Sequence, residues 1–202
     1  MTSTTATRAW AHVLAHGTAP AQDEVLDLVR ASRAITAYSP LAVFGALQTP
    51  DYARAMLTLV AQVHQLSAND IDQAVASRTA RARYLGRPGT TWHVLLTEQA
   101  LRTNIAGSEV MDRQLGRLAD ALDEDGMILG VIPASAPLTA YLAGGFTIYD
   151  NHRVETEDYH GATTLTGQAT VVDHQRIHGM LRESARYGYE ARELITEILR
   201  AI

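Results

Sequence analysis

The feature that most constrains this chain is the stretch from residue 91 to residue 118. It joins a largely apolar run over 92–97, a short segment carrying Glu98, a glycine at Gly107 and an amphipathic segment from Ser108. A short apolar run suits a buried strand, and apolar residues every three to four positions suit a helix. The stretch therefore predicts a strand, a crossing segment, a glycine corner and a helix.

Upstream of this stretch the apolar spacing is helical. It predicts helices over residues 4–16, 20–37, 50–63 and 67–85. The strongest start signal is Thr49-Pro50-Asp51, because threonine is a good N-cap, proline suits the first helical position and aspartate complements the helix dipole. Ser67 is the expected cap of the next helix.

Downstream, strands alternate with turns. Apolar or alternating segments predict strands over 127–132, 146–149 and 154–165, the last interrupted at Gly161, with a hairpin turn at 150–152 and final helices over 170–186 and 189–201. These elements predict an α+β fold with a helical N-terminal half, a small and mainly antiparallel sheet packed by helices, and two C-terminal helices. We expect residues 1–19 to form a helical appendage and residues 20–202 to form one domain.

Composition narrows the class of protein. The 202 residues are long enough to bury a core, and a net charge of -5 argues against a nucleic-acid surface. The absence of cysteine excludes a thiolate nucleophile and Cys-ligated metals. The sequence also lacks a signal-peptide pattern and an apolar run long enough to cross a membrane, so we expect a cytoplasmic protein with neither nucleic acid nor membrane as a partner.

Common cofactor motifs are missing. There is no glycine-rich phosphate loop, dinucleotide fingerprint or nucleophile elbow, so no cofactor is expected. His174 and His178 have the spacing of two metal ligands on a helix, but Gln175 stands where a zinc peptidase has its glutamate. We interpret them as two half-exposed histidines and expect no metal.

The densest group of titratable residues lies over 152–160. Strand alternation would place Val154, Thr156, Asp158 and His160 on one face and Glu155, Glu157 and Tyr159 on the other. If the second face is the inner one, Glu157 becomes an acid or base with a raised pKa. The alternative, which spacing alone favours, is a polar hairpin with one face in water.

Two further groups of charges have both a structural and a functional interpretation. Glu98 follows an apolar strand and could reach a cleft, but Arg102 four residues later makes a structural ion pair the preferred interpretation. Arg78, Arg81 and Arg83 form an arginine face that is either solvated, ion-paired or used for a partner.

A series of short motifs occurs in a distinctive order. They are Phe44-Gly45-Ala46-Leu47-Gln48-Thr49-Pro50-Asp51-Tyr52-Ala53, then Arg78, Arg81 and Leu85, then Thr97-Glu98-Gln99-Ala100-Leu101-Arg102, then Gly107, Met111, Gln114 and Leu115, then Val131-Ile132-Pro133, Gly144-Gly145-Phe146 and Glu157. From about Val25 onward this order resembles the effector-binding domain, catalogued as a domain of unknown function, that follows the helix-turn-helix in actinobacterial Xre-type regulators. Only 43 residues precede Phe44, too few for the usual DNA-binding domain, so we expect no DNA binding.

The resemblance implies a sheet-and-helix domain whose apolar interior takes a small molecule or a partner peptide. The ligand-binding candidates are Phe44, Gln48, Trp92, Arg102, Tyr141 and Phe146, and the catalytic candidates are Glu157, Glu98, His160 and Tyr149. We expect a small-molecule-binding domain derived from a regulator of specialised metabolism. The alternative is a cofactor-independent biosynthetic enzyme, a cyclase or isomerase, that uses the same pocket. A homodimer is also considered, because Trp10 has no assigned partner in the domain.

Overall fold

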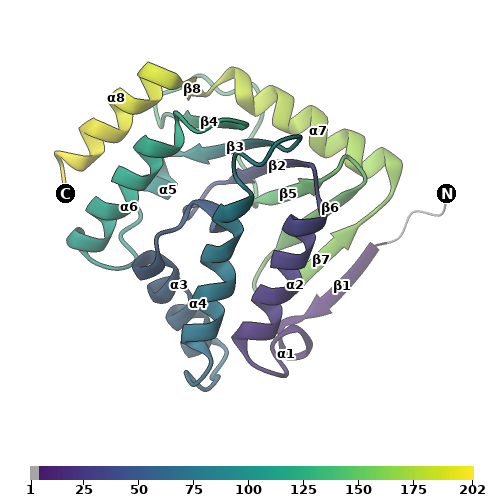
Figure 1. Ribbon diagram of the computed structural model, residues 1–202. Coiled ribbons are helices and arrows are strands. Elements are labelled where there is room, and N and C mark those ends of the chain that lie inside the picture. Colours follow the sequence, from purple (N-terminus) through teal and green to yellow (C-terminus); the bar gives the residue numbers. More distant parts are fainter. Residues whose placement is uncertain (1–4) are drawn as a thin grey trace.

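The structure, a computed structural model, describes residues 5–202 (Figure 1). Residues 1–4, which belong to the expected appendage and to the start of the expected first helix, lie outside the described residues. The helices are α1 (Trp10–Val13), α2 (Thr18–Ala31), α3 (Pro50–Val63), α4 (Ile71–Ala80), α5 (Glu98–Arg102), α6 (Ser108–Ala121), α7 (Gln168–Glu183), α8 (Gly188–Leu199) and the short 3₁₀ helices η1 (Gly45–Leu47) and η2 (Arg81–Tyr84). The strands are β1 (Thr5–Ala9), β2 (Ala34–Ser39), β3 (Thr91–Thr97), β4 (Met127–Ile132), β5 (Phe146–Tyr149), β6 (Arg153–Glu157), β7 (Gly161–Leu165) and β8 (Arg186–Tyr187).

All described strands join one mixed sheet in the order β1-β7-β6-β5-β2-β3-β4-β8. The two pairings that flank β3 are parallel, and the other described pairings are antiparallel. The α+β class and the mainly antiparallel pairing are therefore as predicted. The sheet is larger than expected, because the short strand β8 was not predicted and because two other strands come from segments predicted to be helical.

Those two segments correct the prediction of a helical N-terminal half. Part of the helix expected over 4–16 is strand β1, which pairs antiparallel with β7. The helix expected over 20–37 ends at Ala31, and Ala34–Ser39 becomes β2, which pairs with β3 on one side and β5 on the other. A short apolar run does not distinguish strand from helix by its spacing, and pairing with distant strands decides between them.

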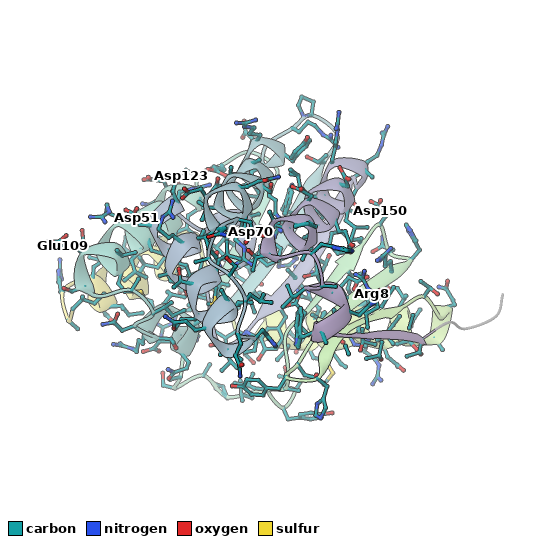
Figure 2. The ribbon with its side chains drawn as sticks, turned by 90° about the horizontal axis from the view of Figure 1, so that it is seen from below. Arg8, Asp51, Asp70, Glu109, Asp123 and Asp150 are labelled. Atoms are coloured by element: carbon teal, nitrogen blue, oxygen red, sulfur yellow. The ribbon has the colours of Figure 1, made fainter. Side chains whose placement is uncertain are left out.

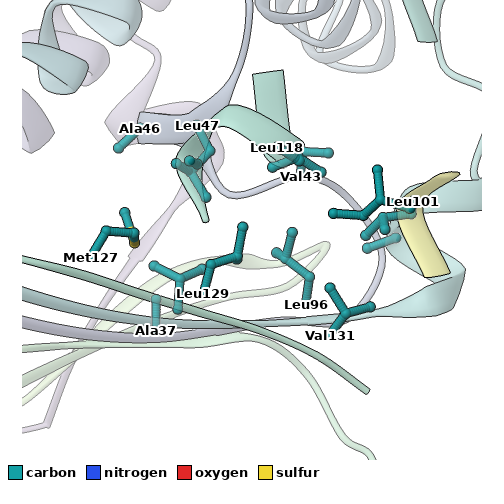
Figure 3. Close-up of a cluster of buried hydrophobic side chains, with 14 of the residues drawn as sticks. Ala37, Val43, Ala46, Leu47, Leu96, Leu101, Leu118, Met127, Leu129 and Val131 are labelled. Carbon is teal, nitrogen blue, oxygen red and sulfur yellow. The ribbon is translucent and has the colours of Figure 1, made fainter. Parts of the chain in front are cut away.

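The main core lies between the sheet and the helices on one of its faces. Strand side chains such as Leu96 and Val131 meet Leu47, Leu101 and Leu118 from the helical layer (Figure 3). A second cluster, which includes Ile148 and Leu181, lies under α7 on the opposite face of the sheet. The two layers of helices are separated by the sheet in Figure 1.

Local capping and turn signals at two places in the chain match the structure closely. The helix start at Thr49 is confirmed, since its side chain accepts a hydrogen bond from Tyr52 N. The predicted hairpin turn is also present: Asp150 and Asn151 have φ of 50° and 59°. Asp150 Oδ1 accepts hydrogen bonds from Arg33 N at 2.7 Å and Ala34 N at 2.9 Å, so the turn is attached to the start of β2.

The expected cap at Ser67 is wrong, because α4 begins at Ile71. Asp70, the residue before α4, interacts with the first turn of α2. Its carboxylate accepts hydrogen bonds from Thr18 Oγ1 at 2.9 Å and Ala19 N at 2.7 Å. Figure 2 labels Asp70 among the packed helices. Asp70 therefore caps α2 from across the helical layer.

Replacing Asp70 with alanine is expected to lower the free energy of unfolding at neutral pH by about 1.5 kcal/mol, because the first turn of α2 loses its acceptor.

Burial raises the pKa of Asp70, but the hydrogen bonds from Ala19 and Thr18 outweigh it and the net pKa is lowered. A lowered carboxylate pKa contributes stability above the unfolded pKa of about 4, and this contribution is lost as pH falls through the folded pKa. Urea unfolding measured from pH 7 to pH 3 should show that the difference in free energy of unfolding between wild type and Asp70→Ala becomes smaller as the pH falls. Asp112→Ala is the matched control, because Asp112 is exposed on α6 and forms no ion pair among residues 5–202. A difference equal to that of this control would contradict the capping role.

Candidate functional site

A cavity of about 770 Å³ lies between the helical layer and the antiparallel half of the sheet. Its helical wall is formed by α2, α3, α4 and the start of η2, and its sheet wall by β5, β6 and the neighbouring strands. Apolar side chains line much of it: Val25, Leu28, Phe44, Met56 and Val60. A volume of this size is typical of sites for organic molecules.

One wall of the cavity carries two arginines. Gln22 Oε1 accepts hydrogen bonds from both, from Arg78 Nε at 2.8 Å and from Arg81 Nη2 at 2.6 Å. Arg78 Nη1 also donates to Gln48 Oε1 at 3.2 Å. The Arg81 side chain is buried, and its Nε has no hydrogen-bond partner among residues 5–202. A neutral glutamine thus holds two guanidinium groups side by side.

Neither arginine forms an ion pair within the described part of the chain. Burial lowers the pKa of Arg78 to about 10, against the opposing charge of Glu157. Burial, and then the charge of Arg78, lower the pKa of Arg81 to about 9. Both groups stay protonated at neutral pH, so the cavity wall carries two positive charges without a carboxylate in contact.

The opposite wall carries carboxylates from β6. Glu155 is neutralised by Arg153 Nε at 2.5 Å and also accepts a hydrogen bond from Thr164 Oγ1 at 2.8 Å. Glu157, at the exposed end of β6, lines the cavity and makes no hydrogen bond within the described residues. Desolvation by nearby protein atoms raises its pKa, although Arg78 and Arg81 act in the opposite direction. Glu157 is the carboxylate of the cavity that is free to interact with a ligand.

The structure brings together about half of the candidates taken from the sequence. Five of them line the cavity: Glu157, Tyr149, Phe44, Gln48 and Phe146. The face of β6 that lines the cavity carries Glu155 and Glu157, while Val154 on the opposite face is buried in the second core cluster, so the alternative of a polar hairpin with one face in water is wrong. Burial raises the pKa of Tyr149 to about 12, so its phenol is a hydrogen-bond donor at neutral pH.

The other candidates lie outside the cavity. Trp92 is in the core behind Phe44, with ring centroids 6.4 Å apart. Glu98 and Arg102 form the expected ion pair at 2.6 Å, and Glu98 also accepts a hydrogen bond from Ala134 N at 2.9 Å. His160 is exposed in the turn between β6 and β7.

Tyr141 is also outside the cavity, since it is 83% exposed in the loop before β5. Tyr159, expected on the inward face with Glu157, is exposed as well, because β6 ends at Glu157 and the alternation ends with it.

Sequence reasoning missed Arg78 and Arg81 as site residues, and it missed Gln22 altogether. A usable signal existed: Arg78 stands three residues after Val75 and four after Ala74, both buried, so helical spacing places it on the inward face. Arg83, in contrast, is exposed. The arginine face is therefore divided between the cavity and the surface.

The two histidines of α7 lie against the other face of the sheet. His174 is partly exposed as predicted, but His178 is only 4% exposed, because its ring packs against His93 at a centroid distance of 4.6 Å. Burial, and then the charge of His93, lower the pKa of His178 to about 4. In the part of the chain that the structure describes, no group of three or more His, Cys, Asp or Glu side chains is placed to hold a metal ion.

The fold and the cavity define a small α+β domain with space for a ligand. By sequence, the chain belongs to the family described as a domain of unknown function, DUF5753, whose model matches residues 22–197. No curated protein is detectably similar in sequence. No helix among residues 5–202 is both long and apolar enough to cross a membrane.

Three solved structures are distantly similar to this chain. NucT from Helicobacter pylori is 10% identical with a TM-score of 0.49, and covers 93% of this chain and 100% of its own. The phospholipase D family member Nuc from Salmonella typhimurium is 12% identical with a TM-score of 0.46, over 93% of this chain and 99% of its own. The archaeal chromatin protein TrmBL2 is 11% identical with a TM-score of 0.39, over 92% of this chain and 54% of its own. Similarity at this level carries no inference about function.

Proposed function

We propose that this chain binds a small organic molecule in the cavity between the helical layer and the antiparallel half of the sheet. The observation that carries the proposal is the cavity of about 770 Å³, in which apolar walls surround a few converging polar groups. These groups are the Arg78–Gln22–Arg81 cluster on one wall and Glu157 on the other. A regulator that senses a metabolite needs a site of this kind.

The finer assignment rests on the order of sequence motifs. We propose that the chain corresponds to the effector-binding domain of actinobacterial Xre-type regulators and acts in the cytoplasm in specialised metabolism. The acidic net charge of -5 supports a role without direct DNA binding. From the sequence, a homodimer is considered because Trp10 has no assigned partner in the domain. In the structure Trp10 has partners within the chain, since its indole donates to Asp158 O at 2.6 Å and contacts the ring of His64. This reason for proposing a homodimer therefore no longer applies.

Ligand binding is testable with a panel of small organic molecules and thermal unfolding. A ligand present at one hundred times its Kd should stabilise the fold by about 2.7 kcal/mol, and the effect should saturate. Ala162→Phe places a large ring into the cavity and should abolish the stabilisation. Thr163→Phe, on the other face of the same strand, is the matched control. Stabilisation that survives Ala162→Phe would place the ligand elsewhere.

The second candidate function is a cofactor-independent cyclase or isomerase. It is favoured by the raised pKa of Glu157, which brings a carboxylate closer to the range useful for proton transfer at neutral pH. Tyr149, protonated and on the same wall, could donate a hydrogen bond to developing negative charge. Each ligand that stabilises the fold should therefore be recovered and examined for conversion. Turnover that disappears in Glu157→Gln while binding persists would favour the enzyme, and unchanged ligand would favour the sensor.

A further inference from the structure

Arg81 is the least expected residue of the cavity. Its side chain is 6% exposed, it makes no ion pair with any residue from 5 to 202, and its Nε lacks a hydrogen-bond partner. A buried charge without a partner destabilises a fold, and such groups are normally paired. The stability of the fold does not explain why the guanidinium of Arg78 lies beside that of Arg81. An anion bound in the cavity would explain both the burial of Arg81 without an ion pair and the nearby Arg78.

The geometry of the cluster leaves donors free. A guanidinium has five N–H groups in one plane. Arg78 uses Nε and Nη1 for Gln22 and Gln48, and Arg81 uses Nη2 for Gln22. Within the described residues, Nη2 of Arg78 and Nη1 of Arg81 have no acceptor and remain available to a ligand. Nε of Arg81 also lacks an acceptor, but this atom is buried from solvent. Because Gln22 is neutral, it orients the two arginines without cancelling their charge.

The carboxylates around the cavity do not contact the two arginines. Glu24 pairs with Arg8 at 2.8 Å, and Glu155 pairs with Arg153 at 2.5 Å. The charge of Glu157 influences Arg78 and Arg81, but among the described residues no carboxylate lies within 4.0 Å of either guanidinium. A ligand carboxylate would give the two arginines a contacting anion.

The rest of the cavity suits an apolar ligand body. Leu28 from α2, Met56 from α3 and Phe44 from the segment before η1 line the same space as Arg78 and Arg81. A polar head near the arginines and an apolar body along these side chains would use both parts of the lining.

From these observations, and resting on the proposed ligand-binding function, we propose that the cavity binds an organic carboxylic acid. Its carboxylate lies between the guanidiniums of Arg78 and Arg81, and its apolar body lies against Leu28, Phe44 and Met56. Gln22 acts as a positioning residue for the two arginines.

The test compares two fluorescent probes that differ only in the head group, pyrenebutyrate and the neutral pyrenebutanol. Wild-type protein should bind the acid at least about tenfold more tightly than the alcohol, since hydrogen bonds from charged donors to a carboxylate are among the stronger ones. Arg81→Met and Arg78→Met should each weaken binding of the acid about tenfold and leave the alcohol unchanged. Arg83→Met, an exposed neighbour, should change neither. Glu157→Gln should strengthen binding of the acid, because a competing negative charge is removed.

Stability provides a second measurement. Without ligand, Arg81→Met should unfold at the same temperature as wild type or higher, because an uncompensated buried charge has been removed. If Arg81→Met does not fold, Arg81→Lys replaces it: lysine keeps the charge but not the planar fork, and should also weaken binding of the acid.

The outcomes separate this inference from the proposed function. Equal affinities for acid and alcohol, both lost in Ala162→Phe, would overturn the carboxylate inference while leaving cavity binding intact. A pyrenebutyl phosphate that binds more tightly than the acid would overturn the assignment to a carboxylate. Failure of both probes would overturn the carboxylate inference, and failure of the broader ligand panel as well would overturn cavity binding.

Discussion

Trp92→Ala is expected to lower the free energy of unfolding by about 4 kcal/mol, the largest effect of any single change considered for this chain. Trp92 is 1% exposed in the central strand β3, where its neighbours are Ile35 in β2 and Met127 in β4. Its indole Nε1 donates to Tyr84 O at 3.2 Å, and its ring meets Phe44 edge-on. Removing the ring leaves a cavity in the core and removes the support of a residue that lines the ligand site.

Urea unfolding of three variants separates the contributions. Trp92→Phe should lose less than Trp92→Ala, because it keeps an aromatic ring and loses the hydrogen bond, worth about 1 kcal/mol. Thr91→Ala, exposed on the same strand, should stay within about 0.5 kcal/mol of wild type. A loss below about 2 kcal/mol in Trp92→Ala would mean that the core collapses around the site.

Gly161→Ala is expected to lower the free energy of unfolding by about 3 kcal/mol, because the added methyl group has no space. A Cβ at Gly161 would lie far inside the contact distance of the Arg8 carbonyl oxygen and 3.0 Å from Ala9 Cα. Both belong to β1, which pairs with β7 at this point. Because backbone atoms cannot rotate away as a side chain can, β1 must shift.

Hydrogen exchange should show where this change acts. In Gly161→Ala the amide protons of β1 should lose protection first, and the wall of the cavity that contains Arg8 should loosen with them. Gly179→Ala is the matched control: Gly179 lies inside α7 with open space around its Cβ position, so alanine should stabilise the fold by about 0.7 kcal/mol. If Gly161→Ala matched this control, the tight approach of β1 and β7 would be refuted.

The fold was predictable wherever the deciding interactions were local. The strands at Met127–Ile132 and Phe146–Tyr149 agree with the prediction residue for residue. The helix start at Thr49 and the turn at Asp150 follow from capping and turn preferences that involve only a few neighbouring residues. The same signals failed for β1 and β2, since these segments become strands only by pairing with β7, β3 and β5, far along the chain.

The candidate site was predictable only in part, for a related reason. Alternation along β6 placed Glu155 and Glu157 on one face but did not decide whether that face is covered, and the motif order pointed to Phe44 and Gln48. Arg78 and Arg81 were not predicted as site residues, because arginines on a helix normally face water. They point toward the cavity because Gln22 on α2 accepts their hydrogen bonds. Gln22 has no motif of its own and gains its role only by lying within reach of Arg78 and Arg81.

The stretch over 91–118 shows where sequence ends and tertiary structure begins. By itself, the sequence determined its strand, its glycine corner at Gly107 and its helix, because backbone preference and apolar spacing act within a few residues. Only the tertiary structure decided that this strand lies between β2 and β4, and that Glu98, expected to pair with Arg102, also accepts a hydrogen bond from Ala134 N. The same packing leaves Arg81 buried beside a cavity, hydrogen-bonded to Gln22 but without an ion pair among residues 5–202, since a site of this kind is assembled from segments far apart in sequence.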